Sequence, residues 1–303
     1  MKLHQLHAAL TVAEKGSLRA AARELGMSQP ALTHNIGELE RELGAALFER
    51  RSHGMTPTPV GELFLRRAKV IASESRRARE EVAQFLGSDH GEVVVCLSIV
   101  AHLVLLPTAL PLFERRFPHV RLRVIEGSFP AVEARLRDGS VDFFIGPAPD
   151  ENLSREFVLE QLFDNTRAVY ARRGHPLAGA RSLSELTEAR WVTTGATDNA
   201  EAKFAEVFAQ HGLPAPRVVA QAETMLSMLM MVMSSDALAI SLRQYNEFPL
   251  TRSALQVIEV KEPLPAPRVV IIRRTALPLT PAAEYLADMF RRAAAAYARS
   301  VPG

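Results

Sequence analysis

The side chains best suited to recognise nucleic acid gather in one short stretch, QPALTHN, which begins at Gln29. Gln and Asn amides can pair with two atoms of an adenine edge, Thr and His can bond base edges or phosphates, and a proline ring can touch a thymine methyl. Projected as a helix at about 100° per residue, one side is an apolar seam of Leu32, Ile36, Leu39 and Leu43. The opposite half is polar and nearly free of acid, and it includes Pro30, Thr33 and His34. This pattern predicts a helix that docks into the DNA major groove.

Short helices must hold this polar face in place. Apolar residues at steps of three and four predict a first helix over residues 3–14. Ser17 can cap a second helix, and Gly26 can end it in the left-handed conformation. Ser28 can then cap the third helix, because the proline two residues later is tolerated in a first turn. The sequence therefore predicts a helix-turn-helix over about 18–37.

A basic pair follows the helices. Arg50 and Arg51 precede Gly54 in a run of alternating residues, which predicts a small β-hairpin, a wing, over residues 48–58. Such a wing can meet phosphates or the minor groove. The alternative is an ordinary three-helix bundle with a solvated face. The candidate DNA contacts are Ser17, Arg19, Ser28, Gln29, Pro30, Thr33, His34, Arg50, Arg51 and His53.

A long helical pattern runs without a break from Thr58 to Leu86. The positions that alternate steps of four and three, the period of a coiled-coil seam, are Val60, Phe64, Ala68, Ile71, Ser75, Ala78, Val82 and Phe85. This period predicts a helix that pairs with a second copy, so that a dimer can engage two DNA half-sites. The alternative is a lone amphipathic helix packed on its own domain.

Strands and helices alternate after a polar hinge at 87–91. The alternation favours an α/β domain with a largely parallel sheet, including a helix at Leu103–Phe117 and a strand at Thr166–Ala171. We expect two lobes that hinge around a small ligand, as in periplasmic binding proteins. Lobe I takes 91–163 and 267–303, lobe II takes 164–266, and the crossings lie near Phe163–Thr166 and Pro263–Pro267.

The candidate effector contacts lie where the expected strands end. Ligands of open α/β sheets bind at strand C-termini and helix N-termini, where backbone N–H groups can hold an anion. Hydroxyls there suit a carboxylate or sulfonate, and Phe129 offers an aromatic wall. The alternative is that these hydroxyls only cap helices and turns. The candidates are Ser98, Ile99, Val100, Ser128, Phe129, Thr193 and Thr194.

Composition and motifs argue against several other classes. The chain of 303 residues has 36 basic and 34 acidic residues, so bulk charge does not indicate nucleic-acid binding. Cys96 is the only cysteine, which excludes an intrachain disulfide and a cysteine-based zinc site. No catalytic motif is found, so we expect no enzyme activity, cofactor or metal. Apolar runs fall short of the roughly 20 residues that span a bilayer, and no secretory signal is visible, so we expect a cytoplasmic protein.

The stretch GSLRAAARELGMSQPALTHNIGELERELGAALFER is similar to the winged helix-turn-helix of the LysR-type transcriptional regulators, and the match covers residues 1–65. Looser marks resemble the effector domain of that family, among them EGS at Glu126 and GHPLA at Gly174. The resemblance implies dimers and tetramers, with promoter DNA, a small-molecule effector and RNA polymerase as partners. AVEARLRDGSVDF and SESRRAREE look closest to regulators of aromatic sulfonate, aromatic acid or sugar catabolism. Where family members usually have Ser-Arg-Gln or Ser-x-Gln, this chain has Thr33-His34-Asn35.

Together these features predict a multidomain α+β protein. A winged helix-turn-helix at 1–58 is joined by a long coiled-coil linker helix at 59–88 to a two-lobed, periplasmic-binding-protein-like α/β domain at 89–303. The preferred hypothesis is a LysR-type regulator that binds promoter DNA and responds to a small organic anion. The alternative is a two-lobed solute-binding protein or enzyme with a helical N-terminal extension.

Overall fold

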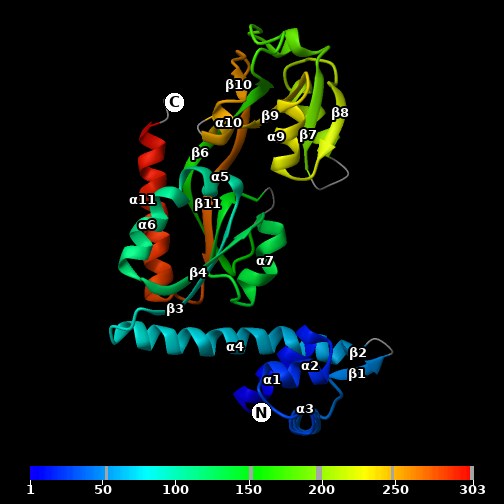
Figure 1. The fold of residues 1–303 in the computed structure, drawn as a ribbon, viewed down its shortest axis with the longest axis vertical. Helices are drawn as coiled ribbons and strands as arrows, with labels where there is room; N and C mark the ends of the chain where they lie inside the picture. The colour runs from blue at the N-terminus through cyan, green and yellow to red at the C-terminus, as the bar shows by residue number, and fades with distance from the viewer. Residues whose placement is uncertain (52–53, 150–152, 196–199, 247–248, 301–303) are drawn as a thin grey trace.

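The computed structural model describes residues 1–51, 54–149, 153–195, 200–246 and 249–300. Its N-terminal part is a helical domain with a two-stranded wing, drawn in blue in Figure 1. The elements are α1 (Leu3–Lys15), α2 (Leu18–Glu24), α3 (Gln29–Leu43), β1 (Phe48–Arg51) and β2 (Gly54–Pro57). As predicted, serine caps precede α2 and α3.

One small core holds α1, α2 and α3 together. Leu32, Ile36 and Leu39 of α3 are buried in it, as the helical projection predicted. Leu43 is 41 % exposed, so the prediction that it extends this seam is wrong. The helix ends at the next residue, where Gly44 adopts the left-handed conformation with φ 67°. The buried seam therefore stops one turn earlier than the sequence pattern.

The loop after α3 contacts both the wing and the next helix. The Glu40 carboxylate accepts the backbone N–H groups of Leu47, at 2.7 Å, and Phe48, at 3.2 Å. α4 (Pro59–Phe85) begins against the same loop, where a Cβ on Gly61 would lie 1.9 Å from the Leu47 carbonyl oxygen. Only glycine permits this approach. The start of α4 is therefore fixed relative to α3.

The rest of the chain forms two lobes, of which lobe I lies beside α4 (Figure 1). The elements of lobe I are β3 (His90–Leu97), α5 (Ile99–Val104), α6 (Leu106–Arg116), β4 (His119–Glu126), α7 (Phe129–Arg137), β5 (Phe143–Pro147) and α11 (Pro281–Ser300). Those of lobe II are η1 (Leu183–Leu186), β7 (Arg190–Thr194), α8 (Ala200–Ala209), β8 (Arg217–Ala222), α9 (Met225–Met233), β9 (Ala237–Leu242), η2 (Arg243–Asn246), α10 (Pro249–Arg252) and β10 (Leu255–Ile258). The strands that pass between the lobes are β6 (Phe157–Arg172) and β11 (Pro265–Arg274).

The strands follow the order β4-β3-β5-β11-β6-β9-β7-β8, with β10 beside β6. β3 is parallel to β4 and β5, and β7 is parallel to β8 and β9. The crossing strands β6 and β11 are antiparallel to all their neighbours. Each lobe is therefore a parallel α/β unit, and an antiparallel pair joins the two.

Apolar residues are buried on both faces of each lobe's sheet. In lobe I, α6 and α11 cover the face that buries Phe290, while α7 covers the face that buries Phe144. In lobe II, Trp191 lies in the core beneath α8, and Met228 of the methionine-rich α9 lies in the opposite core. Separate cores allow each lobe to keep its shape while the crossing strands bend.

Several elements differ from the sequence-based expectations. The helix expected at Leu103–Phe117 is interrupted at Leu105, which separates α5 from α6. The strand expected at Thr166–Ala171 is only the last part of β6, which begins at Phe157. The first half of β6 was missed because its mixed exposure follows no regular period. The short strand β10 was also not expected.

Candidate DNA-binding surface and effector cleft

The outer face of α3 carries the predicted base contacts. The side chains of Gln29, Pro30, Thr33 and His34 are all exposed. Ser28 Oγ accepts a backbone N–H of the first turn at 3.3 Å, so it is a helix cap as well as a candidate contact. Thr33 Oγ1 donates to the Gln29 carbonyl at 2.9 Å, which uses the hydroxyl proton. Thr33 therefore offers DNA an acceptor.

Glu38 is an acidic side chain on this face, which the sequence predicts to be nearly free of acid. His34 Nε2 is 3.3 Å from Glu38 Oε1, one helical turn further on. Both side chains are largely exposed, so their attraction stabilises the free protein little. The carboxylate nevertheless lowers the positive potential at this end of the face.

The first turn of α2 presents a second group of candidates. Ser17 Oγ accepts the Ala20 N–H at 3.4 Å, and Arg19 is exposed in the same turn. Backbone N–H groups at a helix N-terminus attract phosphate, and a nearby guanidinium strengthens that attraction. Ser17 and Arg19 are therefore candidates for contact with the DNA backbone rather than with base edges.

The wing is anchored to the end of α1. A Cβ on Gly54, which has φ 128°, would lie 2.3 Å from the Gly16 carbonyl oxygen. The same oxygen accepts the Met55 N–H at 2.8 Å. The absence of a Cβ on Gly54 lets the hairpin touch the helix end, so the wing has a defined position beside the helix-turn-helix.

The two wing arginines differ in their surroundings. Arg50 is exposed, and Arg51 Nε donates to Glu49 Oε1 at 2.9 Å. To contact a phosphate, Arg51 must therefore give up its bond to the Glu49 carboxylate. Arg50 is exposed, so it is the simpler candidate for a phosphate contact. His53 lies outside the described residues, so it stays a prediction.

The linker helix α4 has one face on its own chain and one face open. Leu65 and Ala68 are buried, and Leu65 belongs to the N-terminal core. An apolar stripe on the same helix is exposed, and Phe85 at its end is 87 % exposed. The exposed stripe consists of Val60, Leu63, Ile71, Val82, Phe85 and Leu86. Part of the predicted seam thus packs within the chain, and the rest is available to a second copy.

A buried ion pair joins α4 to lobe I. Arg77 Nη2 lies 2.9 Å from Asp142 Oδ1, and Asp142 Oδ2 accepts the Val94 N–H at 2.7 Å. Burial lowers the pKa of the Arg77 guanidinium and raises the pKa of the Asp142 carboxyl, while their mutual attraction opposes both changes. Beside them, Arg274 and Glu74 pair at 2.6 Å. Sequence reasoning missed this contact, because nothing local links an arginine on a helix with a carboxylate 65 residues later.

Two cleft candidates have buried hydroxyls without a partner among the described residues. Ser98 follows β3 in lobe I, and Thr193 lies near the end of β7 in lobe II. Ser98 N–H donates to the Ile145 carbonyl at 2.8 Å, which fixes the backbone but leaves the hydroxyl unused. Buried polar groups are almost always bonded in native proteins. Each lobe therefore has, near a strand end, one buried hydroxyl that is without a partner among the described residues.

The other cleft candidates divide into exposed and core residues. Ser128 and Thr194 are exposed, and Ile99 is half-buried against the core of lobe II. Val100 and Phe129 are buried in lobe I, and Phe129 packs edge-on against other phenylalanine rings. This corrects the expectation of an aromatic wall: only the backbone of these two residues can face a ligand. The pattern missed their burial because each begins or lies within a short helix whose inner face is not evident from sequence.

Family comparisons agree with this architecture. Residues 3–62 match the bacterial regulatory helix-turn-helix protein, lysR family, and residues 86–295 match the LysR substrate binding domain. The HTH-type transcriptional regulator GalR of Pseudomonas putida is 28 % identical over 289 residues, with 95 % of this chain and 73 % of that protein covered. CbbR of Xanthobacter flavus is 28 % identical over 305 residues, with 99 % and 90 % covered.

Solved structures show the same fold. A full-length OxyR variant from Pseudomonas aeruginosa has a TM-score of 0.71 at 24 % identity, with 96 % of this chain and 95 % of that chain covered. The LysR family regulator CbnR, in complex with its target DNA, has a TM-score of 0.70 at 20 % identity, with 97 % and 100 % covered.

A winged helix-turn-helix joined by one long helix to a two-lobed substrate-binding domain defines a DNA-binding regulator of transcription. The chain belongs to the LysR family of transcriptional regulators. Its named relatives are regulators and not enzymes, which sets aside the alternative of a solute-binding protein or enzyme. Among the described residues, no helix could cross a membrane, and no group of three or more His, Cys, Asp or Glu side chains could hold a metal.

Proposed function

We propose that this regulator binds promoter DNA as a dimer and that a small organic anion between the lobes controls it. The observation that carries the effector proposal is that the buried hydroxyls of Ser98 in lobe I and Thr193 in lobe II have no partner in the described part of the chain. A carboxylate or sulfonate oxygen is the natural acceptor for both protons. A ligand that bonds both lobes favours their closed arrangement.

The effector proposal is tested by thermal shift of the full chain against aromatic acids, aromatic sulfonates and sugar acids. These three classes follow from the sequence resemblance alone. A ligand present at about 100 times its Kd stabilises the folded protein by roughly 2.7 kcal/mol. Ser98→Ala and Thr193→Val should lose that stabilisation while the unliganded protein remains folded, because each variant removes an unbonded polar group. Retention of the shift in both variants would overturn this site.

We propose that Gln29 and Thr33 read base edges, while Ser17, Arg19, Ser28, Arg50 and Arg51 position the protein on phosphates. Pro30, His34 and His53 complete the proposed surface. Each good base contact contributes about 1–3 kcal/mol to discrimination against a wrong base. Gln29→Ala should therefore weaken binding to the regulator's own promoter by about tenfold. Fluorescence anisotropy with labelled duplex measures this, and Glu188→Ala, an exposed change in lobe II, is the control. Arg50→Ala should instead reduce the salt dependence of binding.

We further propose that α4 pairs with α4 of a second copy, that dimers assemble into tetramers, and that the assembly contacts RNA polymerase in the cytoplasm. The exposed apolar stripe of α4 supports the first step. The proposed division is a DNA-binding domain at 1–58, a dimerisation helix at 59–88 and an effector domain at 89–303, whose lobe I takes 91–163 and 267–303 and lobe II 164–266. Light scattering after size exclusion measures the assembly size.

A further inference from the structure

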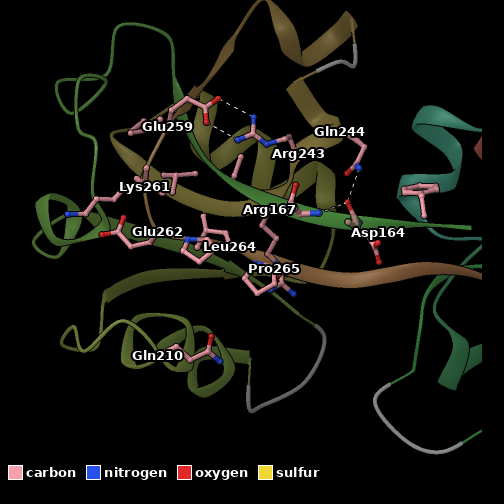
Figure 2. Close-up of a pocket in the computed structure, with 18 of the residues that line it drawn as sticks. Asp164, Arg167, Gln210, Arg243, Gln244, Glu259, Lys261, Glu262, Leu264 and Pro265 are labelled. Carbon is pink, nitrogen blue, oxygen red and sulfur yellow. Dashed lines mark hydrogen bonds and ion pairs between the residues drawn. The ribbon is translucent and has the colours of Figure 1, made fainter. Parts of the chain in front are cut away.

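A cavity of about 1120 Å³, here called the hinge cavity, lies beside the strands that join the lobes. Its walls come from β6 around Arg167, from η2, from the segment between β10 and β11, and from the ends of α8 and α11. Figure 2 shows the Arg243–Glu259 ion pair on one wall and Gln210 across from it. Its lining, as far as the chain is described, includes none of the seven candidates for the effector cleft. The hinge cavity is therefore a separate site.

Two amide side chains that line the hinge cavity are buried and incompletely bonded. Asn165 on β6 is 7 % exposed and Gln244 in η2 is 3 % exposed. Gln244 Nε2 donates to Asn165 Oδ1 at 2.8 Å, which leaves Asn165 Nδ2 and Gln244 Oε1 without a partner among the described residues. Asn165 Oδ1 also accepts the Thr166 N–H at 2.9 Å, and these two donors fix the orientation of both amides. Such a pair calls for a molecule that both donates and accepts.

Arg167 adds a positive charge to the same lining. Its Nη1 donates to the Pro265 carbonyl at 2.8 Å, and no carboxylate of the described residues pairs with it. Arg243, by contrast, holds Glu259 through two bonds of 2.8 and 3.1 Å. Burial lowers the pKa of Arg167, because its guanidinium has lost water without gaining a counter-ion. An anion beside Arg167 would supply that counter-ion.

We propose that the hinge cavity binds a small hydroxycarboxylate as a second effector. The carboxylate bonds Arg167, and a hydroxyl accepts from Asn165 Nδ2 and donates to Gln244 Oε1. This inference uses no residue of the cleft between the lobes, so it goes beyond the effector proposed above and stands or fails separately.

The location gives such a ligand influence over the lobe arrangement. Asn165 and Arg167 lie on β6 and Pro265 lies on β11, the two strands that connect the lobes. The pairing of these strands is irregular between Ala266 and Val269. Irregular pairing bends a strand and leaves fewer ladder hydrogen bonds to resist motion. A ligand bonded to both β6 and η2 therefore stiffens the crossing and favours one arrangement of the lobes.

The test is isothermal titration of the full-length regulator with L-malate and citrate, each compared with its analogue without the hydroxyl, succinate and tricarballylate. Ligand at about 10 mM reveals a millimolar Kd. At least one hydroxy acid should bind, and its analogue should bind about tenfold more weakly, because the two amides stay unbonded. Equal binding of each hydroxy acid and its analogue would overturn the assignment of the amides. Absence of binding by both hydroxy acids would overturn the site.

Variants locate the bound acid. Arg167→Met and Gln244→Leu should each weaken binding by about tenfold or more, while Ser98→Ala in the cleft should leave it unchanged. DNA binding and circular dichroism establish that each variant is folded, and Arg167→Met, a half-buried change, is the one expected to fold without difficulty. Loss of binding in Ser98→Ala with retention in Arg167→Met would place the acid in the cleft and overturn the proposal. If the cleft binds none of the aromatic acids, aromatic sulfonates and sugar acids, the cleft proposal fails, but the proposal for the hinge cavity does not depend on that result.

Discussion

Replacing Arg77 by methionine should destabilise the chain strongly, because it leaves the Asp142 carboxylate buried without its counter-ion. The two side chains are 5 % and 3 % exposed, and their charged atoms are 2.9 Å apart. Breaking one side of such a pair costs about 3–5 kcal/mol. That is a large part of the roughly 5–15 kcal/mol that stabilises a typical native protein.

A double-mutant cycle separates the ion pair from simple loss of packing. Asp142→Asn removes the charge but can keep an oxygen to accept the Val94 N–H, which the carboxylate now accepts at 2.7 Å. In Arg77→Met combined with Asp142→Asn, no charge is left unpaired. The double variant should therefore cost less than the sum of the two single variants, by about 1–3 kcal/mol. Urea unfolding followed by circular dichroism measures each cost from the midpoint at constant slope.

The pH dependence gives an independent check on Arg77→Met. Burial raises the pKa of Asp142, and removal of the arginine takes away the attraction that opposes this rise. A carboxyl whose pKa is higher in the folded state favours folding below its unfolded pKa, about 3.9, and loses that contribution as pH rises through its folded pKa. The penalty of Arg77→Met should therefore be largest near neutral pH and shrink toward pH 4. Additive single-variant costs and a penalty independent of pH would together refute the reasoning.

Three further predictions concern other parts of the chain. Gly61→Ala should displace the start of α4 and lower the melting temperature, because the added Cβ would lie 1.9 Å from the Leu47 carbonyl oxygen. A melting temperature equal to that of wild type would contradict this. Val82→Glu with Phe85→Glu should convert the proposed dimer to a monomer in light scattering, since both side chains are exposed on the apolar stripe and charge opposes their burial. Burial raises the pKa of Cys96 to about 11, so its thiol should react with a disulfide reagent at pH 8 only after unfolding in urea.

The N-terminal domain was predictable because its determinants are local. Ser17 and Ser28 cap helices that start at the next residue, and a glycine follows where a helix must stop. Leu32 and Ile36 are buried because a spacing of four places them on one side of a helix. The capping residue and the apolar period agree at each of these positions, so no distant contact was needed to choose the structure.

The missed features depend on contacts between distant parts of the chain. Asn165 and Gln244 are buried polar residues that the sequence analysis did not single out; Asn165 lies where β6 pairs with β11, and Gln244 lies in η2. Phe129 was assigned to the cleft from its place after a strand, but its side chain points into the core, where it packs against Phe144 and Phe157. Position along a strand is readable from sequence, whereas the direction of a side chain depends on what the tertiary structure places beside it.

The contacts of α4 determine which part of the regulator can respond to a ligand. At one end, Gly61 sets the helix against the DNA-binding domain. Toward the other end, Arg77 bonds Asp142 and Gln84 Oε1 accepts the Ala282 N–H at 3.0 Å, and both partners belong to lobe I. The DNA-binding domain, α4 and lobe I are thus held together by close contacts, while lobe II joins them through β6 and β11 and through the packing of Ile99 of α5 on its core.

A ligand changes an equilibrium only through contacts that differ between the two states. The two proposed ligand sites lie where lobe II meets the rest of the chain. The cleft site has Ser98 and Thr193, and the site at the crossing strands has Arg167 and Gln244. Movement of lobe II is therefore the change that we expect either proposed ligand to drive. Because α4 is bonded to lobe I, we expect the effect of a ligand on DNA binding to pass through a second copy that contacts lobe II. A variant that cannot assemble, such as Val82→Glu with Phe85→Glu, should then still bind both ligands in titration but show no ligand-dependent change in DNA affinity. A ligand-dependent change in the monomer would refute this route.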